Sequence, residues 1–227
     1  PQEVKINSNM DLLIITGASR GLGLSLAKEA LACGHSVAAI SRTSAPIDNP
    51  QYLAFDYDLT RPNGIPKLIG TIFETFDLSK FESLHLVNNA AIIEPIGRSE
   101  TNAPNLKISN LLTNFVAPVI MADSFLSAST NFPGWRVIVN VSTGMQPIPT
   151  WSAYSASKAG LRAYTHAVQN ERRSDEKIRL LNYNPGLMDT LMQEEIRACA
   201  VEVFPEVDRF RGFKKSGALI APEAVAS

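Results

Sequence analysis

The sequence predicts an α/β fold, in which helices cover both faces of one doubly wound parallel sheet. Short apolar runs of strand length alternate with stretches whose apolar residues recur at helical spacing. The chain of 227 residues is 45% hydrophobic and can bury one large core, and no linker or internal repeat divides it. We therefore expect a single domain over residues 10–227. Residues 1–9 (PQEVKINSN) are polar, and we expect them to be an N-terminal extension or a tag remnant.

The first half of the chain supplies four expected strands and two helices. Residues 12–15 are all apolar, as expected of a strand that is covered on both faces. Residues 22–33 place Leu22, Leu26, Ala30 and other apolar side chains on one stripe of a helix, which Gly34 can end. The same patterns predict further strands at 36–40, 52–55 and 83–87, and a helix at 65–76.

The second half continues the alternation. We expect a long helix at 106–127, interrupted or bent near Pro118, a strand at 136–141, a helix at 153–172 and a strand at 178–183. The run Ala-Pro-Glu-Ala-Val-Ala at 221–226 is typical of a helix start. A helix and a last strand normally follow such a start in this architecture, so we expect that a C-terminal helix and strand are missing.

Composition argues against several classes of partner. The formal net charge of −1 offers no electrostatic basis for binding nucleic acid or an anionic membrane. No apolar run approaches the roughly 20 residues of a membrane helix, and no secretory signal is visible. Cys33 and Cys199 do not make a disulfide framework, which favours a cytoplasmic location. His35, His85 and His166 have no metal-ligand spacing, so we expect no metal site.

A glycine-rich turn, TGASRGLG at 16–23, follows the first strand and opens the first helix. Gly17, Gly21 and Gly23 allow a tight turn and a close approach of the backbone to a pyrophosphate at the positive helix N-terminus. An ordinary tight turn is the alternative. The strand before and the helix after are the context that a Rossmann-like dinucleotide cradle requires.

The residues after the second strand indicate the cofactor. NAD enzymes place an acid there to bond the ribose hydroxyl. Here Ser41 and Arg42 follow the strand, and Arg20 adds a second cation from the glycine turn. Two guanidinium groups suit a 2′-phosphate, so we predict NADPH rather than NADH. The alternative is that both arginines are only solvent-exposed residues at the rim of the site.

Tyr154 and Lys158 are four residues apart and lie on one helical face. We expect the lysine cation to favour the phenolate and to lower the tyrosine pKa by roughly 3 units, worth about 4 kcal/mol. Such a tyrosine can transfer a proton near neutral pH. Ser142 ends a strand twelve residues before Tyr154, and its hydroxyl can hydrogen-bond a substrate carbonyl oxygen. Taken alone, a serine at this position is more often a strand-end cap.

These residues together resemble the short-chain dehydrogenase/reductase family over residues 12–190. The shared features are TGASRGLG, Asp58-Leu59, Asn-Asn-Ala-Ala at 88–91, Asn114, Ser142, Tyr154-x-x-x-Lys158 and Pro185-Gly186 with Thr190. The resemblance implies a catalytic tetrad of Asn114, Ser142, Tyr154 and Lys158, in which the Asn114 amide holds a water that links Lys158 to solvent. A solvent-facing asparagine is the alternative. The family resemblance also implies dimers or tetramers, built through the helices that hold Asn114 and Tyr154.

The resemblance and the motifs together assign two binding regions. The predicted cofactor-binding residues are Gly17, Ser19, Arg20, Gly21, Leu22, Gly23, Ser41, Arg42, Asp58, Leu59, Asn89, Ala90, Tyr154, Lys158, Pro185, Gly186, Leu187, Met188 and Thr190. The predicted substrate-binding residues are Ser142, Thr143, Trp151, Tyr154, Gly186 and Met192. Trp151, Met188, Leu191 and Met192 are expected to line an apolar pocket or, alternatively, to be core packing.

Within the family, residues 181–193 and Trp151 look like sepiapterin reductases. The segments ITGASRGLG, Asn-Phe-Val-Ala-Pro at 114–118 and Arg-Phe-Arg at 209–211 look closer to bacterial benzil reductases. The resemblance implies an NADPH-dependent carbonyl reductase of a 1,2-diketone or a sepiapterin-like compound. The alternatives are a short-chain enzyme acting on another ketone or alcohol, and a non-catalytic NADPH-sensing regulator.

Overall fold

Six parallel strands form one sheet in the computed structural model, which describes residues 10–144 and 146–227. The expected extension at 1–9 lies outside the described residues. The sheet order is β3-β2-β1-β4-β5-β6. The strands are β1 (Asp11–Thr16), β2 (Ser36–Ser41), β3 (Tyr52–Asp56), β4 (Ser83–Asn88), β5 (Trp135–Val141) and β6 (Ile178–Tyr183). Every expected strand is present, with bounds that differ by at most one residue.

The central strand β1 has a neighbour on each side, with Leu12 opposite Ser36 of β2 and Leu84 of β4. The chain moves outward from β1 through β2 and β3, then returns to build the other half from β4. The strand order therefore reverses between β1 and β4. Ligands of doubly wound sheets bind at the carboxyl ends of the strands beside this point.

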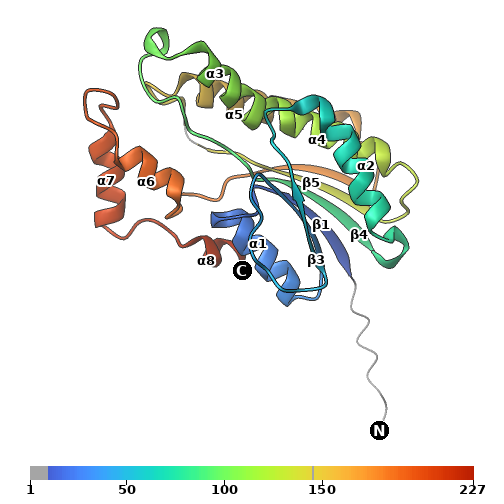
Figure 1. Cartoon of the computed structure of the whole chain (residues 1–227). Helices are drawn as coiled ribbons and strands as arrows, with labels where there is room; N and C mark the ends of the chain where they lie inside the picture. The colour runs from blue at the N-terminus through green and yellow to red at the C-terminus, as the bar shows by residue number, and fades with distance from the viewer. Residues whose placement is uncertain (1–9, 145) are drawn as a thin grey trace.

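Helices cover both faces of the sheet (Figure 1), as predicted. α1 (Gly21–Ala32) and α8 (Pro222–Ala226) lie against one face; α2 (Ile65–Thr75), α3 (Pro104–Leu111), α4 (Ala117–Ala128) and α5 (Ser152–Glu171) lie on the other. Side chains of β1 alternate between the two layers, because strand residues point to opposite faces in turn. Leu12 and Ile14 belong to the core under α2 and α4, and Ile15 to the core under α1.

The expected long helix is built of three segments. A π-helical turn, Leu112–Val116 (η4), separates α3 from α4. Pro118 lies in the first turn of α4 and has no amide proton, so the α-helical bond from residue 118 to the carbonyl of Asn114 cannot form. The interruption predicted near Pro118 is confirmed, and it takes the form of a π turn that contains Asn114.

The expectation that no apolar run approaches the length of a membrane helix was wrong for the stretch that contains α3 and α4. Residues Pro104–Ala128 are long and apolar enough to cross a membrane by length and composition, with a hydropathy of 1.5. The stretch is apolar because α4 packs on the sheet and on α2. Met121, Ala122 and Phe125 are fully buried in that core. Core packing accounts for the hydropathy that a membrane span would also produce.

Two helices were not predicted. α6 (Leu191–Arg197) and α7 (Val207–Lys215) stand beyond the carboxyl ends of the strands, to one side of the sheet (Figure 1). A single bridge between Met188 and Ile220 closes the segment that carries them. Short 3-10 turns at Pro62–Gly64, Leu78–Lys80 and Ser99–Thr101 complete the described elements. α6 and α7 pack on each other, and each is too short for its apolar pattern to stand out in the sequence.

Candidate active site

The glycine turn joins β1 to α1 at the point where the strand order reverses. Gly17 and Gly21 have φ angles of 69° and 54°, which favour glycine over other residues. At Gly23, a Cβ atom would lie 2.3 Å from the carbonyl oxygen of Gly17. The first turn of α1 carries no acidic residue. The turn thus leaves backbone and helix N-terminus open to an anion, as a dinucleotide cradle requires.

Hydrogen bonds tie this turn to the segment after β4. The Asn89 side-chain amide donates to the Thr16 carbonyl oxygen at 3.0 Å. The Thr16 hydroxyl accepts from the backbone amides of Asn89 and Ala90 at 3.0 and 3.1 Å. Thr16 was not among the predicted site residues, although it begins the glycine motif. Through these hydrogen bonds Thr16 fixes the glycine turn relative to the segment that follows β4.

The charged residues predicted at the cofactor end lie together. Arg20 and Arg42 are exposed and line one cavity with Ser41, Asp58 and Leu59. The carboxylate of Asp58 accepts from the amide and the hydroxyl of Thr60, at 2.9 and 2.8 Å. These hydrogen bonds hold the pKa of Asp58 below its usual value. The end of β2 therefore presents cations beside an ionised, internally bonded acid.

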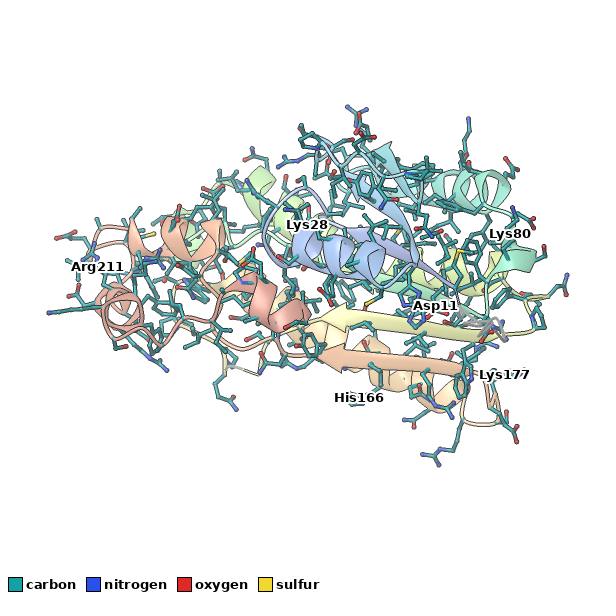
Figure 2. All side chains as sticks on the ribbon, turned by 90° about the horizontal axis from the view of Figure 1, so that it is seen from below. Asp11, Lys28, Lys80, His166, Lys177 and Arg211 are labelled. Atoms are coloured by element: carbon teal, nitrogen blue, oxygen red, sulfur yellow. The ribbon has the colours of Figure 1, made fainter. Side chains whose placement is uncertain are left out.

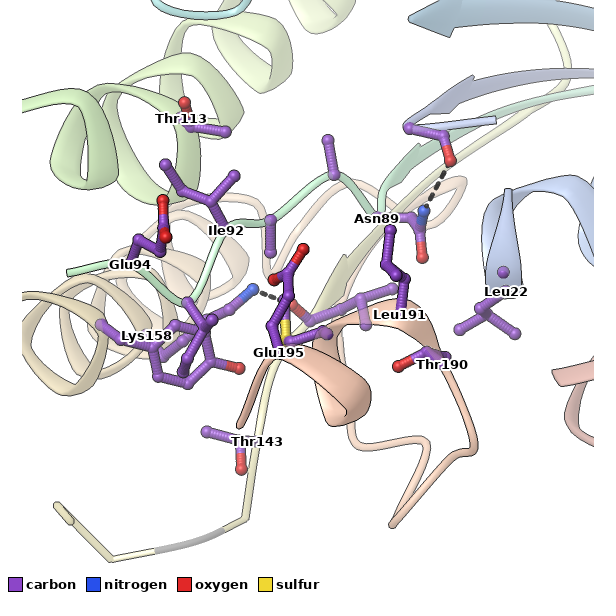
Figure 3. A pocket seen from close by; sticks show the side chains of 18 of the residues that line it. Leu22, Asn89, Ile92, Glu94, Thr113, Thr143, Lys158, Thr190, Leu191 and Glu195 are labelled. Atoms are coloured by element: carbon purple, nitrogen blue, oxygen red, sulfur yellow. Dashed lines mark hydrogen bonds between the residues drawn. The ribbon is translucent and has the colours of Figure 1, made fainter. Parts of the chain in front are cut away.

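The catalytic candidates come from β5 and α5. Ser142 follows β5, and Tyr154 and Lys158 occupy the first turns of α5. The Lys158 ammonium donates to the Val141 carbonyl oxygen at 2.7 Å, and it lies 5.9 Å from the centroid of the Tyr154 ring. Figure 3 shows Lys158 reaching inward to the cavity. Ser142 precedes Tyr154 by twelve positions and Lys158 by sixteen, and the fold brings all three to one wall of the cavity.

The predicted electrostatic effect has the wrong direction in this structure. Burial raises the pKa of Tyr154 to about 12 and lowers the pKa of Lys158 to about 8. Removing either group from water penalises its charged form. The lysine is only 3% exposed, so the loss of solvation outweighs its attraction to the phenol. The sequence identified the pair but not the burial that controls its protonation.

Ser142 presents an unmatched hydrogen-bonding group. Its side chain is 7% exposed, and its hydroxyl oxygen is buried without a hydrogen-bond partner in the described part of the chain. A buried hydroxyl that lacks a partner costs about 1–3 kcal/mol. Ser142 lines the same cavity as Tyr154 and Lys158. The site is therefore suited to a ligand oxygen that would bond this hydroxyl.

The Asn114 side-chain amide bonds protein groups through both its nitrogen and its oxygen. The residue is fully buried, and its amide nitrogen donates to the Ile92 carbonyl oxygen at 2.7 Å and to the Asn110 side chain at 3.1 Å. Its amide oxygen accepts from the Ile92 backbone at 2.9 Å. Both amide protons are used, so the amide cannot donate to a water beside Lys158. Asn114 instead positions the segment that follows β4.

One cavity of about 770 Å³ collects nearly all of the predicted site residues. Gly23 and Asn114 are the two that do not line it, because both are buried behind its wall. The cavity also has walls that the sequence did not indicate. These include Thr43, Ile92, Glu94, Arg162, Gln193, Glu195 and Phe210. Arg162 comes from α5 and the others from loops and from α6 and α7, where no motif marks them.

Aromatic packing closes the far end of the cavity. Trp151 is 4% exposed and packs on Phe204 and Phe210, each with a ring-centroid distance of 5.2 Å. Its ring also meets that of Tyr154 edge-on at 5.9 Å. Trp151 is therefore both core packing and cavity lining, so the two alternatives for this residue are not exclusive. α7 supplies Phe210, which packs on Trp151 beside the Tyr154 phenol.

The fold and the site together define a class of oxidoreductases. A doubly wound sheet with a glycine turn at the strand reversal faces a Ser-Tyr-Lys set across one cavity. The family model described as short chain dehydrogenase matches residues 11–200. The chain belongs to this family.

Curated relatives and a solved structure agree with that assignment. The chain is 32% identical over 220 residues to "Benzil reductase ((S)-benzoin forming)" of Bacillus subtilis, covering 96% of this chain and 90% of the relative. It is 27% identical over 228 residues to a sepiapterin reductase of Rattus norvegicus, covering 91% and 85%. The crystal structure of the KRED1-Pglu enzyme has a TM-score of 0.78 and 28% identity, covering 95% and 91%. The predicted resemblance to benzil reductases and sepiapterin reductases is confirmed.

Proposed function

We propose that the chain is an NADPH-dependent carbonyl reductase that reduces one ketone of a 1,2-diketone or a sepiapterin-like compound. One observation carries the proposal. The buried, unpartnered hydroxyl of Ser142 shares a cavity with Tyr154 and with the glycine turn. A substrate carbonyl oxygen that accepts a hydrogen bond from Ser142 would give this hydroxyl the partner that it lacks.

The residues at the cofactor end fit a dinucleotide. Added Cβ atoms at Gly17 and Gly23 would meet neighbouring atoms at 2.9 and 2.3 Å, so the turn depends on bare backbone. Arg20 and Arg42 supply two cations for a 2′-phosphate. Bound NADPH would supply a hydride to the carbonyl carbon.

The chain's own residues have separable roles in the reduction. The Ser142 hydroxyl donates a hydrogen bond to the carbonyl oxygen and stabilises the charge that develops there. The Tyr154 hydroxyl donates a proton to the same oxygen. A pKa of about 12 keeps this phenol protonated at neutral pH, so it holds the proton that the more basic alkoxide takes up. The Lys158 ammonium is held by the Val141 carbonyl oxygen in the cavity that Tyr154 lines.

The substrate class follows from the relatives and from the cavity wall. Benzil reductases and a sepiapterin reductase are among the curated relatives. Trp151, Met192 and Ile196 form a mainly apolar wall next to Tyr154. Such a wall favours an aryl or alkyl diketone by apolar burial.

The test is NADPH consumption with benzil, sepiapterin and a simple monoketone, with product chirality for each substrate that turns over. Replacing Tyr154 with phenylalanine should remove most of kcat while NADPH affinity stays nearly unchanged. Tyr164→Phe is the matched control, because Tyr164 lies on the same helix, bonds Asp123 of α4 and does not line the cavity. Tight NADPH binding without turnover of any substrate would instead favour a regulator, and near-normal turnover in Tyr154→Phe would refute the assignment.

We also propose that the chain acts in the cytoplasm as a dimer or tetramer. Ile108 and Leu111 on α3 are 56% and 38% exposed, which supports an apolar contact along this helical face. Light scattering after size-exclusion chromatography measures the assembly. A single species of monomer mass at micromolar concentration would contradict this part of the proposal.

A further inference from the structure

Two acidic side chains line the cavity that holds the catalytic residues. Glu94 comes from the segment that follows β4, and Glu195 comes from α6. Figure 3 shows both carboxylates at the cavity, with Lys158 drawn beside them. Neither carboxylate forms a hydrogen bond or an ion pair in the described part of the chain, and both residues are exposed. The cavity therefore carries two unpaired negative charges.

Their position places them at the substrate end. Ile93, next to Glu94, and Ile196, next to Glu195, belong to the cluster that packs Tyr154 and Trp151. Ser142 supplies an independent mark of where a ligand oxygen binds, because its buried hydroxyl lacks a partner. The two carboxylates thus line the cavity next to residues of the cluster that includes Tyr154 and Trp151.

The cations of the same cavity come from the cofactor end or are bonded to backbone carbonyl groups. Arg20 and Arg42 belong to the glycine turn and to the segment after β2, whereas Ser142 follows β5. Arg162 directs its guanidinium to the Thr143 carbonyl oxygen at 3.0 Å. Lys158 is bonded to the Val141 carbonyl oxygen and belongs to the catalytic set. A negatively charged substituent on a substrate would therefore face two carboxylates that form no ion pair in the described part of the chain.

We propose that Glu94 and Glu195 make the enzyme select neutral 1,2-diketones over α-keto acids. This inference rests on the proposed carbonyl-reductase function. Both substrate classes present vicinal carbonyl groups, so the Ser142 and Tyr154 hydroxyls alone do not separate them. A substrate carboxylate at about 8 Å from an exposed glutamate would be disfavoured about threefold to tenfold by each repulsion at low salt.

The test compares methyl phenyl diketone with phenylglyoxylate, which differ in charge at one end. Glu94→Gln, Glu195→Gln and the double variant remove the charges with little change of shape. Glu194→Gln is the matched control, because Glu194 is exposed on the same helix but does not line the cavity. The double variant should raise kcat/KM for phenylglyoxylate about tenfold and leave the diketone within about twofold. The gain should shrink as salt is added.

Two outcomes overturn the inference while the reductase function stands. One is an unchanged diketone-to-keto-acid ratio in the double variant, and the other is an equal change in Glu194→Gln. If neither compound is reduced, the proposed function fails and the charge selection is measured by binding. Trp135→Phe leaves Trp151 as the single tryptophan, so quenching of its fluorescence reports on the cavity. With both glutamates present, benzamide should then bind more tightly than benzoate. The double variant should bind the two compounds with similar affinity. Equal affinities for the two compounds with both glutamates present would refute the inference.

Discussion

Replacing Lys158 with methionine should make the fold more stable at neutral pH while it removes most of the activity. Burial lowers the pKa of Lys158 from 10.5 to about 8. At about 1.4 kcal/mol per pH unit, the folded state bears a penalty of about 3 kcal/mol for holding this cation at pH 7. Methionine has a similar length and no charge, so it removes that penalty.

Part of the gain is offset by a lost hydrogen bond. The ammonium donates to the Val141 carbonyl oxygen at 2.7 Å. Leaving that buried carbonyl without its partner costs about 1–2 kcal/mol. The expected net gain in the free energy of unfolding at pH 7 is therefore about 1–2 kcal/mol.

The pH dependence separates this effect from a general change in packing. Between pH 8 and 10.5 the unfolded chain holds a proton on Lys158 that the folded protein has released. Wild-type stability should therefore rise with pH across that window because of this group. The Lys158→Met variant lacks the rise, so the two stability curves should converge above pH 8 and then cross. Tyr154, with a pKa of about 12, weakens both proteins above pH 10 and sets the upper limit of the measurement.

The assay is urea unfolding without cofactor at several pH values from 7 to 10. Lys67→Met on α2 is the control, because Lys67 is exposed and its replacement should leave the pH curve parallel to that of the wild type. A Lys158→Met variant that is less stable at pH 7, or that keeps the wild-type pH slope, would refute the reasoning.

Three further perturbations test other parts of the structure. Gly23→Ala should destabilise the fold by about 2 kcal/mol or more, because its Cβ would lie 2.3 Å from a backbone oxygen, whereas Gly70→Ala, whose Cβ meets nothing within 4 Å, should be neutral or stabilising in the same urea titration. Arg42→Ala should raise KM for NADPH about tenfold and leave KM for NADH within about twofold, and steady-state kinetics that show equal changes would remove its role at the 2′-phosphate. Lys214 donates a hydrogen bond to Asp189 and lowers the pKa of Asp189, so the contact stabilises α7 at neutral pH and is lost as pH falls through the lowered pKa. Asp189→Asn should therefore increase proteolysis within 205–217 at pH 7. An unchanged cleavage rate would contradict this.

Local patterns were sufficient for much of the fold. Strand positions followed from short apolar runs, since buried parallel strands are apolar on both faces. Gly17 and Gly21 could be identified as turn residues from their spacing, and their positive φ angles confirm it. The interruption of the long helix followed from Pro118, because a missing amide proton is a property of the residue itself.

The residues that were missed share a different property. Glu94, Gln193 and Glu195 line the cavity but belong to a loop and to α6, where no repeat or motif marks them. The Asn114 amide was assigned to a water, whereas its partner is the backbone of Ile92, which is 22 residues earlier in the chain. Contacts between distant segments depend on how the elements pack, and spacing along the chain does not encode them.

The sequence by itself determined the layered sheet, the cofactor turn and the identity of the Ser142, Tyr154 and Lys158 set, because each depends on neighbouring residues and on residue type. The tertiary structure decided how those groups ionise and what surrounds them. Burial raises the pKa of Tyr154 and lowers the pKa of Lys158, against the expected direction. The dielectric environment of a side chain is set by all the elements that pack around it, so charge states and cavity walls appear only once the chain has folded.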